Sequence, residues 1–218
     1  MLVRGAWVYI AGRSTTTMNM ALIYSAAPVL IMIGSVLWLG ERLTRPQCVG
    51  AILSLVGVLH VTVKGHWGAL ADVRFSSGDL WIVAATLGWA AYALLLKTWP
   101  SALSASARVA VTSFAGVCVL LPFAIWEAFT PFAIALSPHA LLLIVVAALL
   151  PGLLAFWAYG HAQQILGSGR VAASLYLAPL FAAIAAYLLL DEKLQSFHLI
   201  GGIMVLGGLA LASRKARA

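Results

Sequence analysis

The sequence predicts an all-α, polytopic membrane protein of about seven transmembrane helices, and composition and apolar pattern carry that prediction. Of its 218 residues, 63% are hydrophobic and only 9% are charged, whereas about 25% are charged in an ordinary soluble domain. Apolar stretches recur at close to the ~20 residues that a helix needs to cross a bilayer. They are unbroken rather than alternating, which argues against a membrane β-barrel. A soluble protein is excluded, and little chain is left for a catalytic domain outside the membrane.

The predicted spans are separated by short stretches rich in turn-forming and charged residues. In chain order the spans cover about 17–40, 47–64, 79–97, 106–128, 139–165, 170–190 and 196–213. Before the first of them, the apolar run from Ala6 to Gly12 is too short to cross a membrane. It predicts a piece of a helix.

The chain also contains an internal repeat. Residues 21–62 (the first copy) align without a gap on residues 172–213 (the second copy) at a constant offset of 151, with twelve identities in 42 pairs. The pairs that apolar composition would not supply by chance are Pro28 with Pro179, Glu41 with Glu192, Leu43 with Leu194, Gly50 with Gly201, Gly57 with Gly208, and the conservative Arg42 with Lys193. Each copy reads as a helix with an internal proline, a charged hairpin and a helix with spaced glycines.

The repeat predicts an inverted topology. Four predicted spans lie between the first helix of the first copy and the first helix of the second copy. Because every span reverses direction, the first helix of the second copy enters the membrane from the opposite side. Inverted repeats are typical of secondary transporters, whose substrate site lies near the midplane. The 151-residue offset places the counterpart of residue 79 about 72 residues before Met1, so we expect two helices and most of a third to be absent from the first unit.

These residues resemble a known family. The runs ALIYSAAPVLIMIGSVLWLGERLTRPQCVGAILSLVGVL and AASLYLAPLFAAIAAYLLLDEKLQSFHLIGGIMVLGGL are similar to helices four and five and helices nine and ten of EamA-type transporters in the drug/metabolite transporter superfamily. GDLWIVAATLGWAAYALLLK resembles the sixth helix. The second copy has Leu190-Asp191-Glu192 in place of the usual LGE.

The resemblance implies a ten-helix fold of two five-helix units. On that basis residues 1–66 would form a partial first unit, 67–78 a linker loop and 79–218 a complete second unit. It also implies transport of a small organic solute, such as a metabolite, amino acid or drug, commonly by export and by alternating access. The lipid bilayer and the solute are the expected partners, with no nucleic acid.

Aromatic and polar residues inside the spans are the candidate lining of a substrate cavity, because such groups are costly in lipid unless they face a cavity or a partner. Trp157, His161 and Gln164 lie at i, i+4 and i+7 of one helix, and Trp89 and Tyr92 lie within one turn of each other. His161 could instead bond to a neighbouring carbonyl group. Weaker candidates of the same kind are Tyr176, Asn19 and Tyr24.

Pro28 and Pro179 sit inside apolar spans, where each removes a backbone donor. We expect a helix kink at both positions, favoured over direct substrate contact. The paired bends would then outline a central cavity.

Spaced glycines form stripes on the last helix of each copy. Gly50 and Gly57 make one stripe with Ser54, and Gly201 and Gly208 repeat it. Small residues let helix backbones approach closely. Internal packing is the expected use, and a homodimer face is the alternative.

Charged residues between the spans predict the orientation. Glu41, Arg42, Arg45, Asp191, Glu192 and Lys193 lie at helix ends, where we expect solvated turns. With a cytoplasmic carboxy terminus, eight cations fall inside and four outside, as the positive-inside rule requires. The inside set is Arg42, Arg45, Lys97, Arg108, Arg170, Arg214, Lys215 and Arg217; the outside set is Arg13, Lys64, Arg74 and Lys193. The expected location is the cell membrane, the inner membrane if the chain is bacterial.

The sequence contains no GxSxG, HExxH, P-loop or GxGxxG motif. We therefore expect no enzyme activity, no cofactor and no metal site. The two cysteines, Cys48 and Cys118, have no CxxC spacing. Two alternatives stay open: an integral membrane enzyme that acts on lipid-linked substrates, and a non-transporting remnant of a transporter.

Overall fold

The computed structural model describes residues 8, 11, 12, 14–99, 103–129, 137–190 and 193–213. Within them the chain forms helices and no strands, which confirms the all-α prediction. The helices are α2 (Thr17–Ser25), α3 (Ala27–Leu39), α4 (Arg45–Thr62), η1 (Trp67–Leu70), α5 (Ser77–Thr98), α6 (Ala105–Ala128), α7 (Pro138–Ala147), η2 (Ala148–Leu154), α8 (Ala155–Leu166), α9 (Ser168–Ser174), η3 (Leu175–Leu177), α10 (Ala178–Leu190) and α11 (Ser196–Ala212).

Several predictions fall outside the described residues. These are the charges Arg13, Asp191, Glu192, Arg214, Lys215 and Arg217, and most of the helix piece expected at Ala6–Gly12.

The predicted spans are present as helices. Six helical stretches are long and apolar enough to cross a membrane, and α11 is a shorter apolar helix. One stretch, Pro138–Leu166, was expected as a single span and instead contains a π-helical segment, η2, around Pro151. Proline lacks the amide that the regular ladder needs, so the helix widens there.

The sequence repeat is also a repeat of structure. α2 and α9 begin at residues 17 and 168, α3 and α10 at 27 and 178, and α4 and α11 at 45 and 196, so each pair keeps the 151-residue offset. In both copies the first span is broken just before its proline. A turn at Ala26 precedes Pro28, and η3 precedes Pro179.

The glycine stripes pack α4 directly against α11. A Cβ atom on Gly57 would lie 2.8 Å from the carbonyl oxygen of Gly201, and one on Gly201 would lie 2.8 Å from that of Gly57. Gly50 and Gly208 contact each other's backbone in the same reciprocal way. Only glycine fits at such an approach, and the stripes are used inside the chain, so a homodimer would need a different surface.

This reciprocal pairing shows that the two copies are inverted. Gly50 corresponds to Gly201 in the repeat but contacts Gly208, the counterpart of Gly57. α4 and α11 therefore run antiparallel about a local two-fold axis. The axis passes beside Ser54, whose hydroxyl group donates a hydrogen bond of 3.3 Å to the carbonyl oxygen of its own counterpart, Val205.

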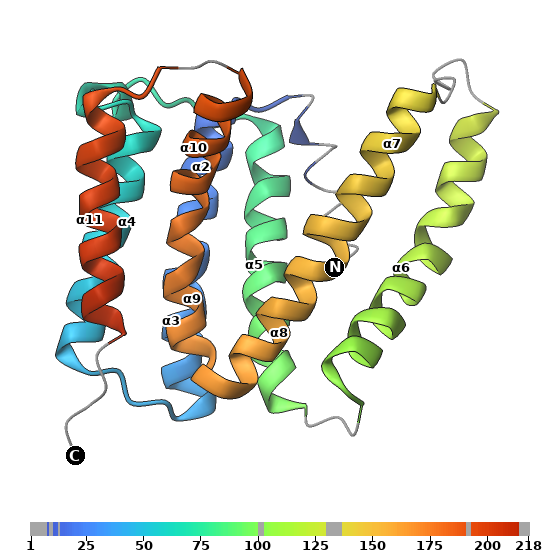
Figure 1. Ribbon diagram of the computed structural model, residues 1–218, viewed down its shortest axis with the longest axis horizontal. Helices are drawn as coiled ribbons and strands as arrows, with labels where there is room; N and C mark the ends of the chain where they lie inside the picture. Colours follow the sequence, from blue (N-terminus) through green and yellow to red (C-terminus); the bar gives the residue numbers. More distant parts are fainter. Residues whose placement is uncertain are drawn as a thin grey trace.

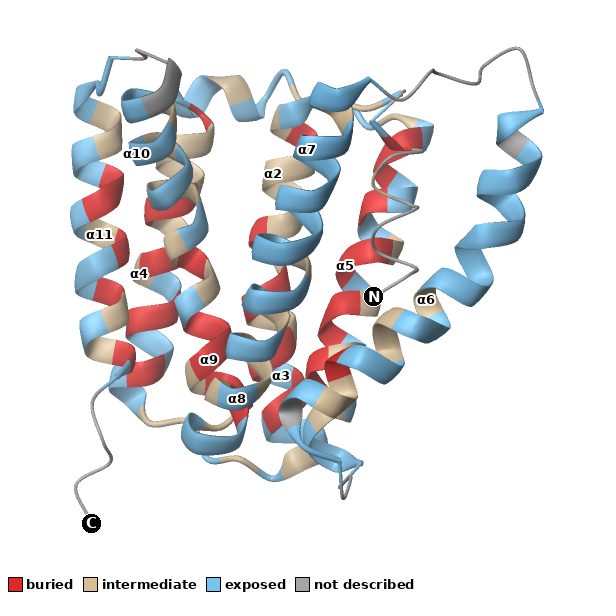
Figure 2. Ribbon diagram, turned by 45° about the vertical axis from the view of Figure 1, so that its right-hand side comes forward, coloured by how far each residue is buried: buried red, intermediate tan, exposed pale blue. Residues whose placement is uncertain are grey.

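The bundle is closely packed at one side and open at the other (Figure 1). The α4–α11 pair forms one edge, α2–α3 and α9–α10 come next, and α5 follows. A core cluster joins α3, α5 and α9 through residues that include Ile31, Trp89 and Ala172. Figure 2 shows buried residues along these helices, whereas α6 and α7 are exposed along most of their length.

Candidate functional site

An aromatic cluster joins α5 to α8. The ring centroid of Trp89 lies 5.6 Å from that of Tyr92, 5.6 Å from that of Phe156 and 5.0 Å from that of Tyr159. Trp89 is buried, and the other three rings are half-buried. The prediction singled out Trp89 and Tyr92. Phe156 and Tyr159 were missed because nothing in a single apolar helix distinguishes them from lipid-facing aromatic residues.

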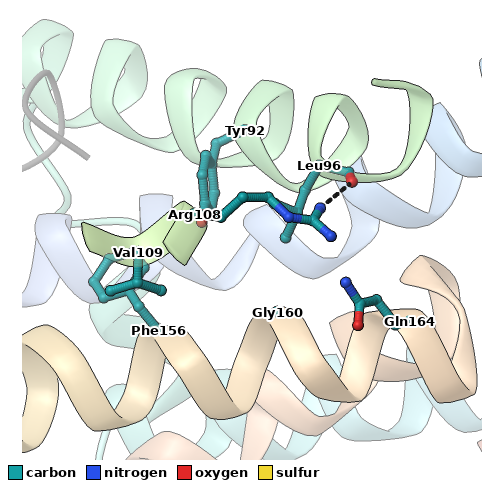
Figure 3. Close-up of a pocket in the computed structure, with 7 residues that line it drawn as sticks. All are labelled: Tyr92, Leu96, Arg108, Val109, Phe156, Gly160 and Gln164. Carbon is teal, nitrogen blue, oxygen red and sulfur yellow. Dashed lines mark hydrogen bonds between the residues drawn. The ribbon is translucent and has the colours of Figure 1, made fainter. Parts of the chain in front are cut away.

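A small cleft lies beside this cluster, between α5, α6 and α8 (Figure 3). It is lined by Tyr92, Leu96, Arg108, Val109, Phe156, Gly160 and Gln164. Tyr92 and Leu96 approach it from α5, and Phe156 and Gln164 from α8 (Figure 3). Gly160 adds no side chain between the last two. Apolar walls with few polar groups are the usual lining of a small-molecule site, although the cleft in this conformation has room for only about one water molecule.

Arg108 is the charged residue of this cleft. Its guanidinium group donates a hydrogen bond of 3.4 Å to the carbonyl oxygen of Leu96, and its Nε atom has no partner among the described residues. Figure 3 shows the guanidinium group facing the Gln164 amide group across the cleft. Sequence reasoning counted Arg108 only as an orientation charge, since it lies at the start of a span.

Gln163, next to the predicted Gln164, is the buried polar residue of α8. It is 4% exposed, and its Nε2 atom donates a hydrogen bond of 3.1 Å to the hydroxyl oxygen of Tyr159. Its Oε1 atom has no donor among the described residues. A buried carbonyl group without a donor costs free energy, so this atom is a ready acceptor beside the aromatic cluster.

The structure does not bring Trp157 and His161 into the cleft. Their rings stack on the exposed side of α8, with centroids 5.6 Å apart and planes at 2°. The inward stripe consists of Phe156, Gly160 and Gln164. Phe156 and Gly160 are each displaced by one residue from the predicted Trp157 and His161, which is about 100° around a helix, whereas Gln164 belongs to both stripes. The sequence alone does not fix that rotation.

Asn19 lies in a polar cluster at the start of α5, away from the cleft. Its Nδ2 atom donates hydrogen bonds to the Oδ2 atom of Asp79 at 2.8 Å and to the carbonyl oxygen of Arg74 at 2.9 Å. Asp79 is 1% exposed and also accepts from the backbone amide of Ser76 at 2.7 Å and from the hydroxyl group of Thr15. This cluster fastens α2 to α5. Sequence reasoning placed Asp79 at a loop boundary and gave it no role.

The two remaining tyrosine candidates are also separate from the cleft lining. Tyr176 is 2% exposed and packs with Val58 and Val205 near the α4–α11 pair. Tyr24 is half-buried on α2.

Glu41 corrects the prediction that the hairpin charges are solvated. It forms an ion pair with Lys97 at the end of α5. It also accepts hydrogen bonds from the Ser168 hydroxyl group at 3.0 Å and from the Gly169 amide at 3.3 Å. Partial burial raises the pKa of Glu41, but these hydrogen bonds and the Lys97 charge outweigh it and leave the pKa below its usual value. Glu41 thus links the first copy to α5 and to the start of the second copy.

The neighbouring charges Arg42, Arg45 and Lys193 are exposed, as expected of solvated turns. Among the described residues, no group of three or more His, Cys, Asp or Glu side chains could hold a metal ion.

Comparison with known proteins identifies relatives over nearly the whole chain. The sequence model of the EamA-like transporter family matches residues 3–63 and 76–214. An uncharacterized transporter of Archaeoglobus fulgidus is 26% identical over 96% of this chain and 71% of its own length. A probable terminal-alkyne amino-acid exporter of Streptantibioticus cattleyicolor is 26% identical over 89% of this chain and 63% of its own length.

A third relative, the uncharacterized transporter YetK of Bacillus subtilis, is 27% identical over 89% of this chain and 59% of its own length. The chain thus spans between 59% and 71% of the length of these relatives. One solved crystal structure matches with a TM-score of 0.79 at 19% identity, covering 96% of this chain and 73% of the other. That likeness supports the fold.

Proposed function

Because this chain belongs to the EamA-like transporter family, we propose that it works as a membrane transporter that carries a small organic solute by alternating access. The inverted pair of copies, related by a two-fold axis between α4 and α11, is the observation that carries this proposal. Two inverted halves can exchange conformations and so expose one site to either side in turn. Export is the proposed direction, since one relative is named an exporter.

We propose that Trp89, Tyr92 and Gln164 border the solute path. Trp89 and Tyr92 belong to one aromatic cluster, and Tyr92 and Gln164 line the cleft between α5, α6 and α8. Trp157 and His161 are exposed on α8 and do not line the cleft, so they serve as controls. Residues 1–66 and 79–218 would act as the two moving units, joined by residues 67–78.

The contact of Glu41 fits a closed gate in this mechanism. It ties the hairpin of the first copy to Lys97 and Ser168, which lie together at one end of the bundle. This contact would open when the cavity opens to that side.

The test of transport is solute flux in proteoliposomes that contain the full-length protein. Trp89→Ala and Tyr92→Ala should lower flux at least several-fold, because they remove ring surface from the path. Trp157→Ala, a change of similar size on the exposed side of α8, should leave flux within about twofold of the wild type. Unchanged flux in both Trp89→Ala and Tyr92→Ala would contradict the proposed solute path, and the absence of flux for every solute would contradict the transporter function.

Orientation has a separate test. We propose that the carboxy terminus and the 41–46 turn are cytoplasmic, in the inner membrane if the cell is bacterial. Cys48, exposed near that turn, should then react with a membrane-impermeant thiol reagent in inverted vesicles and not in intact cells. Cys118 is exposed along the middle of α6 and should be shielded by lipid in both. Labelling of Cys48 in intact cells would reverse the proposed topology.

A further inference from the structure

We propose that the cleft between α5, α6 and α8 selects solutes that carry a carboxylate group, with Arg108 as the cation that binds it. This inference rests on the proposed transport function and names the substrate class of that site. It predicts a small organic carboxylate with an apolar body.

The first argument is that Arg108 has no carboxylate partner among the side chains that the structure describes. The ion pair formed by the described residues joins Lys97 to Glu41, and Glu41 is further occupied by Ser168 and Gly169. The described contacts of the Arg108 guanidinium group amount to one long hydrogen bond with the Leu96 carbonyl oxygen, and its Nε atom is buried without a partner. Arg108 lies at the start of the span Ser106–Trp126. An ionisable group in a span is a candidate ligand or ion site when no described side chain neutralises it.

The second argument is distance from the other described acidic cluster. Asp79 lies at the start of α5, whereas Leu96 lies near its end. Seventeen residues of helix separate them by about 26 Å. The oxygens of Asp79 are moreover held by Asn19, Ser76 and Thr15. No carboxylate among the described side chains therefore neutralises Arg108, and its charge can act on a solute.

The third argument is the shape of the cleft. A guanidinium group offers a planar fork of donors that matches a carboxylate. The Gln164 amide group faces Arg108 across the cleft and can supply a further donor (Figure 3). Tyr92 and Phe156 line the cleft beside the charge, and the apolar body of a solute would contact them when the cleft widens in the transport cycle.

The same features disfavour other ligand classes. An organic cation would be repelled by Arg108, and like charges in a site of low polarity are costly. A phosphate dianion would keep one charge unbalanced, since the described cleft lining contributes a single cation. A monocarboxylate balances that charge.

The test compares three probes of one shape with the purified full-length protein in nanodiscs. The probes are 3-phenylpropanoate, 3-phenylpropanamide and 3-phenylpropylamine, and equilibrium dialysis measures their binding. The carboxylate should bind at least about tenfold more tightly than the amide and the amine, because a hydrogen bond to a charged group adds more than 1.4 kcal/mol. This comparison needs no variant, so it stands even if substitutions at Arg108 disturb folding.

Variants then assign the preference to Arg108. Arg108→Gln should lower carboxylate affinity to the level of the amide, and Arg108→Lys should retain part of the preference. Arg45→Gln, which removes an exposed cation at the start of α4, should change nothing. The inference is overturned if the wild type binds the amide or the amine as well as the carboxylate, if the carboxylate does not bind, or if Arg108→Gln keeps the preference. Flux of a neutral or cationic solute that is insensitive to Arg108 would overturn it while leaving the transport function intact.

Discussion

The α4–α11 pair and the α6–α7 region are both built from apolar helices, but the first pair is in close backbone contact and the second region is largely exposed. All four helices are apolar. α4 and α11 meet through glycines on facing stripes, whereas α6 and α7 bear large side chains such as Phe114 and Leu142, which are 71% and 60% exposed. In a membrane, apolar surface alone gives no reason for helices to associate, because lipid is equally apolar. The size of the residues on each face decides which helices pair.

The strongest test of this comparison places a large side chain on the glycine stripe. Gly208→Leu should destabilise the protein by about 3 kcal/mol or more, since a side chain there meets the backbone of Gly50 and the hydroxyl group of Ser54. Unfolding in SDS or on heating measures the loss. Gly207→Leu, one residue away on the exposed face of α11, is the matched control and should be nearly neutral. An equal loss of unfolding free energy in both variants would show that the close approach of α4 and α11 does not stabilise the protein.

A second test addresses the buried hydrogen bonds around Asp79, which join α2 to α5 at a contact made without glycines. Asp79→Ala should cost about 2–3 kcal/mol of unfolding free energy, because Asn19, Ser76 and Thr15 lose a buried acceptor. Asp72→Ala removes an exposed carboxylate from the preceding loop and should have little effect. A stable Asp79→Ala variant would mean that the cluster does not hold the two helices.

A smaller effect is expected at Glu41, whose ion-pair partner Lys97 is partly exposed. Glu41→Gln should cost about 1 kcal/mol at pH 7. The pKa of Glu41 is lowered in the folded chain, so its contribution is present above the unfolded pKa and is lost as the pH falls through the folded value. The difference in melting temperature between wild type and Glu41→Gln should thus shrink below about pH 4.5. A difference that grows on acidification would contradict this linkage, and Arg42→Gln, an exposed neighbour, is the control.

The smallest effect is expected on the open side of the bundle. Val145→Ala on α7, where the valine is 51% exposed, should change unfolding free energy in detergent or lipid by less than about 0.5 kcal/mol. A larger loss would indicate that α7 packs against protein in the membrane and would break the contrast with α4–α11.

Much of the fold was predictable because it depends on local patterns. The length of the apolar stretches predicted the spans. The repeated prolines predicted a kink in each first span, and the structure has a break just before Pro28 and Pro179. The glycine stripes at Gly50 and Gly208 were predicted to pack, but which glycine meets which was not, since the antiparallel register is set by contacts between distant segments.

The site was less predictable for the same reason. Trp89, Tyr92 and Gln164 were selected as bulky or polar groups inside spans, while Phe156 and Arg108 were not. The rotation of α8 about its own axis decides that Phe156 faces inward and Trp157 outward, and neighbouring helices set that rotation. Glu41 looked like a solvated turn because its partners Lys97 and Ser168 are 56 and 127 residues away.

The sequence by itself determined that this chain is an inverted-repeat membrane protein, because hydrophobic length and a 151-residue offset are properties of the chain in one dimension. The tertiary structure alone decided that α4 and α11 share a two-fold axis, that Glu41 joins the two copies, and that Arg108 enters a cleft with Tyr92 and Phe156. Those features depend on the rotation and register of helices packed against one another. Such relations arise from complementary surfaces in three dimensions, which no single helix encodes.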